Sequence, residues 1–101
     1  MRRVSLNKYG QFLSSREKAR VIRLEVDSVF DLGESVVFDF EGVSATQSFL
    51  DELIGVLVLK RGADLLKSTE FAHCSNDSKL ILKYVVKSRL KDRSNGASVA
   101  A

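Results

Sequence analysis

The chain has 101 residues, of which 45% are hydrophobic and 29% are charged, and its formal net charge is +3. This balance is typical of a soluble globular protein, and the length predicts a single domain. The longest apolar run, Leu53 to Leu59, is far shorter than the ~20 residues of a transmembrane helix. The start of the chain lacks the apolar segment of a signal peptide, and Cys74 has no second cysteine to pair with. We therefore expect a cytoplasmic protein without membrane association.

Charge is distributed unevenly along the chain. Residues 31–60 contain six acidic residues and one lysine, whereas the segments on either side are basic. Because the acidic stretch lies at the centre of the chain, we do not expect a nucleic-acid groove there. Faces of unlike charge suit docking to a protein partner, or self-association into a homodimer.

The first residues predict a short edge strand. Val4 and Leu6 alternate with polar residues, as on a half-buried strand. The next segment is a connection, in which we expect Phe12 and Leu13 to turn inward.

A helix is predicted from about residue 15 to residue 30. Ser14 and Glu17 form a possible capping box, with Ser15 as the neighbouring choice for the cap. Gly33 is expected to end the helix in a left-handed conformation. One face repeats apolar residues with a helical period, and the other carries cations that should be solvated. The apolar face is Ala19, Ile22, Val26, Val29 and Phe30, and the cations are Arg16, Lys18, Arg20 and Arg23.

The central stretch predicts a buried strand, a loop and a helix. The apolar run from Val36 to Phe40 is typical of a strand covered on both faces. Gly42 allows the chain to turn, and Ser48 with Asp51 predicts a capping box at the start of a helix that ends at Gly62. Two adjacent apolar stripes indicate that this helix is packed: Phe49, Leu53 and Leu57, and Leu50, Ile54 and Val58.

The last third predicts a strand, a helix and a tail. Residues 63–68 are ambiguous, whereas Thr69 to Cys74 suit a third strand. Ser75 or Asn76 then caps a helix from about residue 77 to residue 93, and residues 94–101 are expected to be a flexible tail. The predicted apolar members of this helix are Leu80, Ile81, Tyr84, Val85 and Leu90.

Alternating strands and helices predict an α/β fold over residues 1–93. Consecutive β-α units place their strands in parallel, so we expect a mainly parallel sheet of about 3–4 strands packed against about three helices.

Asp39 is a candidate functional residue because it follows the buried strand. Ligands and partners of parallel α/β proteins bind at the carboxyl ends of strands, and a carboxylate there needs a partner or water. Two interpretations remain open. Asp39 either fixes a recognition loop, or it only accepts hydrogen bonds from the amides of Gly42 to Ser44.

His73 and Cys74 provide the only imidazole and the only thiol. Neighbours on a strand point to opposite faces, so these two cannot form a catalytic dyad. No second histidine or cysteine is present to complete a metal-ligand set. We therefore predict no enzyme, no cofactor and no metal site, with Cys74 buried and His73 partly exposed.

The acidic pair Asp51 and Glu52 is not expected to be an acid/base pair, because helix neighbours point about 100° apart. Asp51 would belong to the cap, and Glu52 would face solvent or a partner. Ser48 is either a pure cap or a phosphate acceptor. The helix dipole would stabilise the phosphate, and the two acids would oppose it.

Two motifs resemble the signature of the STAS-like domain family of unknown function, and they follow one another in the family's order. They are Phe38-Asp39-Phe40-x-Gly42-Val43 and Gln47-Ser48-Phe49-x-Asp51-Glu52. The earlier Ser15-Arg16-x-x-Ala19 is similar to the first-helix pattern of that family.

The resemblance implies a small α/β domain like the bacterial anti-sigma factor antagonists, which dock on a histidine-kinase-like ATPase or an anti-sigma factor. Antagonists that are switched by phosphorylation carry Asp-Ser-[Ser/Thr]-Gly where this helix begins. Here Phe49 occupies the position most like the phosphoacceptor, which leaves Ser48 and Thr46 as candidate phosphorylation sites.

We therefore hypothesise a non-enzymatic regulatory domain that binds a protein partner in signalling. Phe49 would either anchor the helix or enter a pocket of the partner. The predicted partner-binding residues are Asp39, Gly42, Thr46, Gln47, Ser48, Phe49, Asp51 and Glu52. The alternative is a nucleic-acid-binding accessory protein that uses the basic first and last helices. Its contact residues would be Arg16, Arg20, Arg23, Lys87, Arg89, Lys91 and Arg93.

Overall fold

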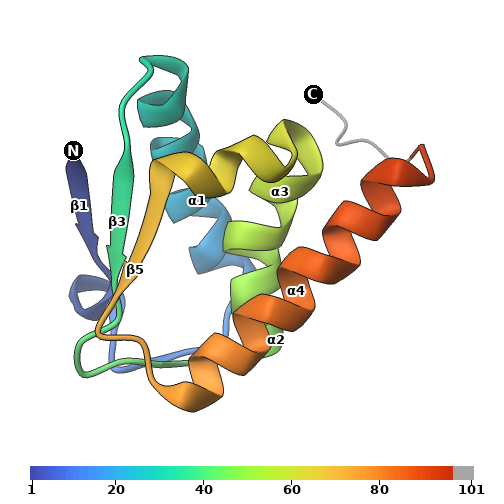
Figure 1. Ribbon diagram of the computed structural model, residues 1–101. Coiled ribbons are helices and arrows are strands. Elements are labelled where there is room, and N and C mark those ends of the chain that lie inside the picture. Colours follow the sequence, from blue (N-terminus) through green and yellow to red (C-terminus); the bar gives the residue numbers. More distant parts are fainter. Residues whose placement is uncertain (97–101) are drawn as a thin grey trace.

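Three parallel strands form the main sheet of the computed structural model, which describes residues 1–96 (Figure 1). The strands are β1 (Arg2–Ser5), β3 (Val36–Asp39) and β5 (Thr69–Ala72), in the order β1-β3-β5. A second sheet pairs two short parallel strands, β2 (Phe12–Leu13) and β4 (Ser44–Ala45). The predicted parallel α/β fold is confirmed.

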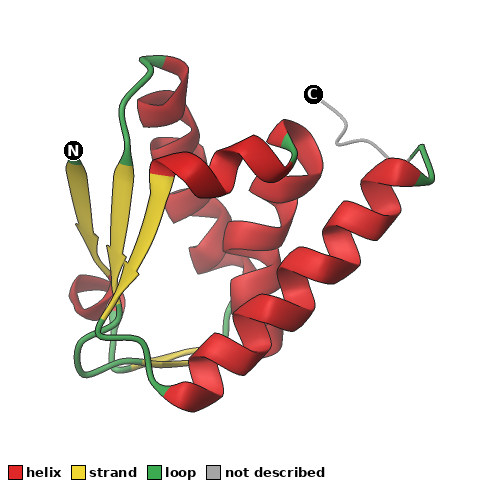
Figure 2. Ribbon diagram, viewed as in Figure 1, coloured by secondary structure: helices red, strands yellow, loops and turns green. Residues whose placement is uncertain are grey.

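Helices make the crossovers between the strands and gather on one side of the main sheet (Figure 2). Helix α1 (Arg16–Asp31) connects β1 to β3, and α4 (Asn76–Ser94) follows β5. Between β3 and β5 lie α2 (Gln47–Leu50), a π-helical turn (Asp51–Gly55) and α3 (Val56–Arg61). Residues 6–9 and 63–68 form 3-10 helices, which resolves the ambiguous segment.

Strand β3 is buried along its whole length, as predicted, but its two faces are covered differently. Val36 and Phe38 belong to the hydrophobic core shared with the helices. Val37 points to the other side of the sheet, where Arg3 and Glu70 lie in register with it. Because side chains alternate along a strand, Asp39 lies on that same second face.

Local signals place the ends of α1 and α4. Ser15 accepts a hydrogen bond from the Lys18 amide, and Ser75 accepts one from the Ser78 amide, so both are N-caps. Ser15 is thus the correct choice over Ser14. Gly33 has the positive φ expected of a residue that ends a helix.

Several predicted orientations are wrong. Phe12 is 69% exposed because adjacent residues of a strand point to opposite faces, and its neighbour Leu13 takes the inward position on β2. Leu6 is buried as expected, but it lies in a 3-10 helix after β1. On α4, Leu80 and Tyr84 face solvent and Leu82 is buried instead.

The predicted boundaries of β5 and α4 shift slightly. The strand ends at Ala72, so His73 and Cys74 lie in the turn that follows it. Helix α4 continues to Ser94, one residue beyond the predicted end of the domain. The predicted tail therefore begins later, and its residues 97–101 lie outside the described part of the chain.

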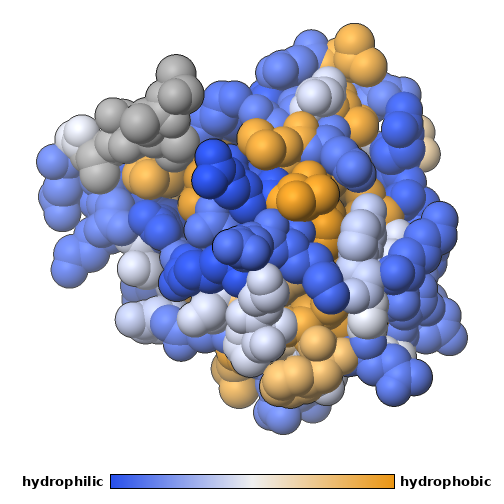
Figure 3. Space-filling model, turned by 180° about the vertical axis from the view of Figure 1, so that it is seen from behind, coloured by the Kyte–Doolittle hydropathy of each residue, from blue (hydrophilic) through white to orange (hydrophobic). Residues whose placement is uncertain are grey.

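The surface is mainly hydrophilic on the back of the molecule, where apolar side chains form separate patches (Figure 3). Within residues 1–96, no helix combines the length and the apolar character needed to cross a membrane.

Candidate functional site

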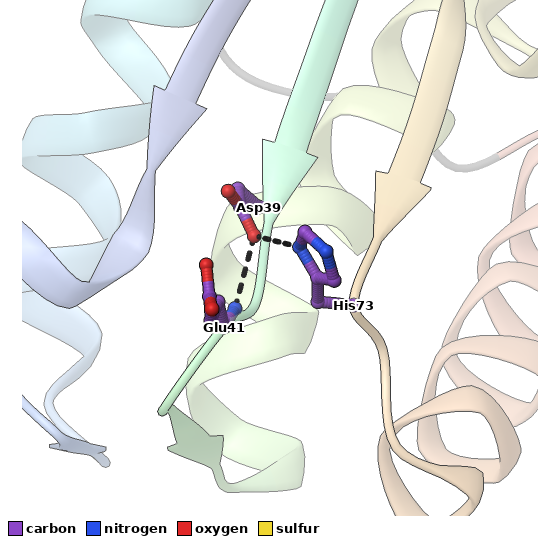
Figure 4. Close-up of side chains that lie close together, drawn as sticks. All are labelled: Asp39, Glu41 and His73. Carbon is purple, nitrogen blue, oxygen red and sulfur yellow. Dashed lines mark hydrogen bonds and ion pairs between the residues drawn. The ribbon is translucent and has the colours of Figure 1, made fainter.

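The strands of the main sheet end at one edge, where Asp39 lies in register with Ser5 on β1 and Ala72 on β5. The Asp39 side chain is 10% exposed and accepts contacts from three directions. Arg3 Nη2 lies 2.6 Å from Oδ2, and the Glu41 amide donates to Oδ1 at 3.0 Å. His73 Nδ1 lies 2.9 Å from the same Oδ1 (Figure 4). A carboxylate can only accept, so the imidazole proton sits on Nδ1.

These contacts favour the first of the two interpretations of Asp39, in which it fixes the loop. Its carboxylate accepts from the Glu41 amide rather than from the amides of Gly42 to Ser44, and it links Arg3 on β1 to His73 in the turn after β5. Hydrogen bonds from His73, from the Glu41 amide and from Arg3 lower the pKa of Asp39 to about 2. Ionised Asp39 therefore attaches the start of the loop to the main sheet.

His73 reaches Asp39 through an unusual backbone conformation. Its φ is +53°, in the left-handed region that few residues other than glycine adopt. The predicted partial exposure of its ring is confirmed, because the side chain is 57% exposed. The sequence pattern predicted His73 as part of the third strand and did not indicate this turn. No motif of neighbouring residues predicts the hydrogen bond between His73 and Asp39.

Asp39, Glu41 and His73 place one possible ligand atom each within 4.8 Å of one another. This set could in principle hold a metal ion. However, the Arg3 guanidinium already contacts Asp39, and a cation at that position opposes a second cation. The cluster is therefore best described as an ion-pair network.

Acid titration tests the role of Asp39. Because its native pKa is about 2, below the ordinary value of 3.8, ionised Asp39 stabilises the fold above about pH 4, and this contribution disappears as the pH falls to about 2. We expect Asp39→Asn to be less stable than the wild type at pH 6, with a difference that shrinks at pH 2. Urea unfolding at both pH values measures this difference. An equal difference at both pH values would contradict the assigned network.

Backbone hydrogen bonds hold the loop after β3 in a defined conformation, and we call residues 41–48 the platform. Val43 N–H donates to the Phe40 carbonyl oxygen at 3.0 Å, and Gly42 has the positive φ that this turn requires. Ser44 and Thr46 amides then donate to backbone carbonyls of the segment that contains β2. This pairing of β4 with β2 was not predicted, because two-residue strands leave no periodic pattern.

The cap of the following helix is Thr46, which corrects the prediction of Ser48. Thr46 Oγ1 accepts from the Phe49 amide at 3.3 Å, and α2 begins at Gln47. Ser48 is exposed within the first turn. Asp51 therefore takes no part in a capping box.

Asp51 and Glu52 form ion pairs within the domain. Arg89 makes a two-pronged contact with Asp51, at 2.9 Å and 2.7 Å, and Arg23 Nη2 lies 3.0 Å from Glu52 Oε2. Arg16 contacts both acids. Burial raises the pKa of Asp51, but the hydrogen bonds and charges of Arg89 and Arg16 outweigh it and leave the pKa lowered. Arg23, predicted to be solvated, is only 13% exposed.

The exposed residues of this region surround a polar hollow of about 260 Å³. Gln47 and Ser48 line it from α2, and Tyr84 and Ser88 line it from α4. Phe49 points away from the hollow and is fully buried in the core. Tyr84 was missed as a site residue because its spacing on α4 resembled that of a core position.

The structure thus brings together most of the predicted site residues, in two roles. Gln47 and Ser48 are exposed beside Tyr84. Gly42 is exposed and allows the turn, whereas four others support the platform through buried or partly buried side chains: Asp39, Thr46, Phe49 and Asp51. Glu52 is 20% exposed and pairs with arginines of α1.

The fold and this edge define a small α/β domain with a three-stranded parallel sheet and a polar platform at its carboxyl end. A family model described as a STAS-like domain of unknown function (DUF4325) matches residues 18–79, more than half of the chain. The chain therefore belongs to this family, as its motifs indicated. Neither the curated proteins nor the solved structures gave a match.

Proposed function

We propose that the chain is a non-enzymatic regulatory domain that binds a protein partner through the platform of residues 41–48. The observation that carries this proposal is the position of Tyr84, which is 59% exposed beside Gln47 and Ser48. Exposed tyrosines next to polar hollows are favoured anchors in protein interfaces, because they bury a large area and still hydrogen-bond.

The rigidity of the platform supports the same proposal. The loop is attached to β2 by backbone hydrogen bonds and to the main sheet through Asp39. A surface that is already ordered loses little conformational entropy when a partner binds. The partner class, a histidine-kinase-like ATPase or an anti-sigma factor, follows from the resemblance to antagonist domains and is part of the proposal.

The two candidate phosphorylation sites differ in access. The Ser48 hydroxyl is on the exposed first turn, whereas the Thr46 hydroxyl accepts the capping hydrogen bond. A phosphate on Ser48 would add about two negative charges in the hollow that Arg16 and Asp51 also line. We propose Ser48 as the residue through which modification would alter docking.

The contacts of the basic residues weigh against the nucleic-acid alternative. Arg16, Arg23 and Arg89 pair with acids, and Arg93 donates to the carbonyl oxygens of Leu59 and Lys60. These four arginines are among the seven cations of that alternative, and phosphate contacts would have to displace their present partners.

Calorimetric titration with a histidine-kinase-like ATPase as the partner tests the docking surface. We expect Tyr84→Ala to weaken the affinity at least about tenfold, which corresponds to ~1.4 kcal/mol. Gln47→Ala should weaken it by a smaller factor. Leu32→Ala is the matched control, because Leu32 is 75% exposed directly after α1 and lies outside the hollow. Unchanged affinity for both Tyr84→Ala and Gln47→Ala would remove this surface from the proposal.

A further inference from the structure

An apolar groove of about 850 Å³ runs between strand β5 and helix α4. Phe71 and Cys74 line it on the side of the sheet, and Leu82, Val86 and Leu90 line it on the side of the helix. The Phe71 ring stacks on Phe38, with the ring centroids 5.9 Å apart, so the wall of the groove is part of the packed core. In Figure 1, β5 and α4 are joined at the bottom of the view and diverge upward from there.

The groove lies along a free strand edge. Strand β5 is the last strand of the order β1-β3-β5, so within residues 1–96 only its β3 side is paired. The Ala72 carbonyl oxygen accepts from the Phe40 amide and therefore faces β3. Because alternate residues direct their backbone groups to opposite edges, the N–H and C=O of Phe71 point to the free edge. Such groups can template the addition of another strand.

A row of lysines borders the groove on the helix side. Lys79, Lys83 and Lys87 are all exposed and are spaced by four residues, so they lie on one face of α4 beside the apolar wall. Within residues 1–96 none of the three forms an ion pair, in contrast to Arg89 on the same helix, which pairs with Asp51. The row therefore presents positive charge that no described carboxylate neutralises.

We propose that this groove binds an extended segment of a partner protein, which pairs with the edge of β5 as an additional strand. The side chains on the helix-facing side of this strand would be apolar and would contact Phe71, Leu82 and Val86, and acidic residues that flank this apolar stretch would pair with the lysine row. Backbone pairing supplies affinity in this mode of recognition, and the side-chain pockets supply specificity. The groove is separate from the platform around Gln47, so this inference does not depend on the proposed function.

The chemistry of the groove favours an extended peptide with acidic residues over a second copy of this chain and over a nucleic acid. A second copy of the chain paired β5 to β5 would bring two lysine rows together, and like charges that face each other disfavour that arrangement. A nucleic acid would satisfy the lysines but would leave the apolar wall without a partner of matching chemistry.

Selection from a displayed library of random ten-residue peptides tests the proposal on the full chain. We expect enrichment of peptides that carry apolar residues at every second position, with acidic residues flanking this apolar stretch. Enrichment of basic peptides, of apolar residues at helical spacing, or of no pattern would overturn it. Binding of a single-stranded RNA in preference to the selected peptides, or dimerisation of the chain that excludes them, would do the same.

Two further measurements locate the binding site and identify the mode of binding. Lys83→Glu with Lys87→Glu should weaken the selected peptide at least about tenfold. Lys8→Glu with Arg20→Glu changes the net charge by the same amount and lies outside both the groove and helix α4, so it should leave the affinity within about twofold. N-methylation of alternate peptide amides should abolish binding in one register and spare it in the other, because only one edge of an added strand pairs. Equal loss in both pairs of variants, or equal effects in both registers, would overturn the proposal.

Discussion

Replacing Phe49 by alanine is expected to lower the free energy of unfolding by about 3–5 kcal/mol. The Phe49 side chain is fully buried among core residues of the helices, and alanine would leave a cavity that the packed surroundings cannot fill completely. Urea denaturation followed by circular dichroism measures the change. This result would assign Phe49 to anchoring the helix, the first of the two roles that its sequence position allowed.

Phe12 provides the matched control for Phe49. It has the same side chain, but it is 69% exposed. Phe12→Ala should therefore change the unfolding free energy by no more than about 0.5 kcal/mol. Equal effects of the two substitutions would show that the first turn of α2 is not seated in the core as described.

Replacing Gly55 by alanine is expected to destabilise the protein by about 1–3 kcal/mol, although alanine is the better helix former. A methyl group at this position would lie 2.6 Å from Asp51 Oδ1 and 2.9 Å from Val85 Cγ1. Asp51 is held by Arg89, and Val85 is buried, so neither neighbour can move freely. Gly55 ends the π-helical turn where α4 passes closest. Thermal unfolding would measure the loss.

Two further variants show whether this loss comes from the close approach. Ser28→Ala, on the exposed face of α1, should leave the stability unchanged or slightly raised, since the gain in helix propensity offsets the loss of the exposed hydrogen bond from Ser28 Oγ to the Leu24 carbonyl oxygen. Val85→Ala removes one of the two contacting groups. Its combination with Gly55→Ala should therefore destabilise less than the sum of the two single changes. Strict additivity would contradict the overlap between residues 55 and 85.

Features with a short-range cause were predictable from the sequence. Ser15 and Ser75 cap helices through their own first-turn amides, and Gly33 ends a helix by its own φ. The apolar residues of β3, Val36, Val37 and Phe38, are buried because β-branched and aromatic side chains suit a covered strand. The family motifs around Asp39 and Gln47 likewise lie within a few residues of one another, and the family match agrees with them.

The candidate site was predicted in position but not in its contacts. Gln47 and Ser48 are exposed in the first turn of α2, as the hypothesis requires. The partners of Asp39, namely Arg3 and His73, are more than 30 residues away along the chain. No local pattern relates such residues, because the sheet register alone brings them together.

The same distinction explains the errors in the helices. Thr46 and Ser48 are both acceptable caps by residue type, and the pairing of β4 with β2 selects Thr46 by setting where the chain enters α2. On α4, apolar residues lie on more than one face, so periodicity could not choose between Leu82 and Tyr84. Tertiary packing made that choice, because Val85 and Arg89 of α4 pack closely against Gly55 and so fix which face of the helix turns inward. Interactions between residues close in the sequence thus determined the helices, the strands and many of their ends. Packing between residues far apart in the sequence determined which faces of these helices and strands contact one another.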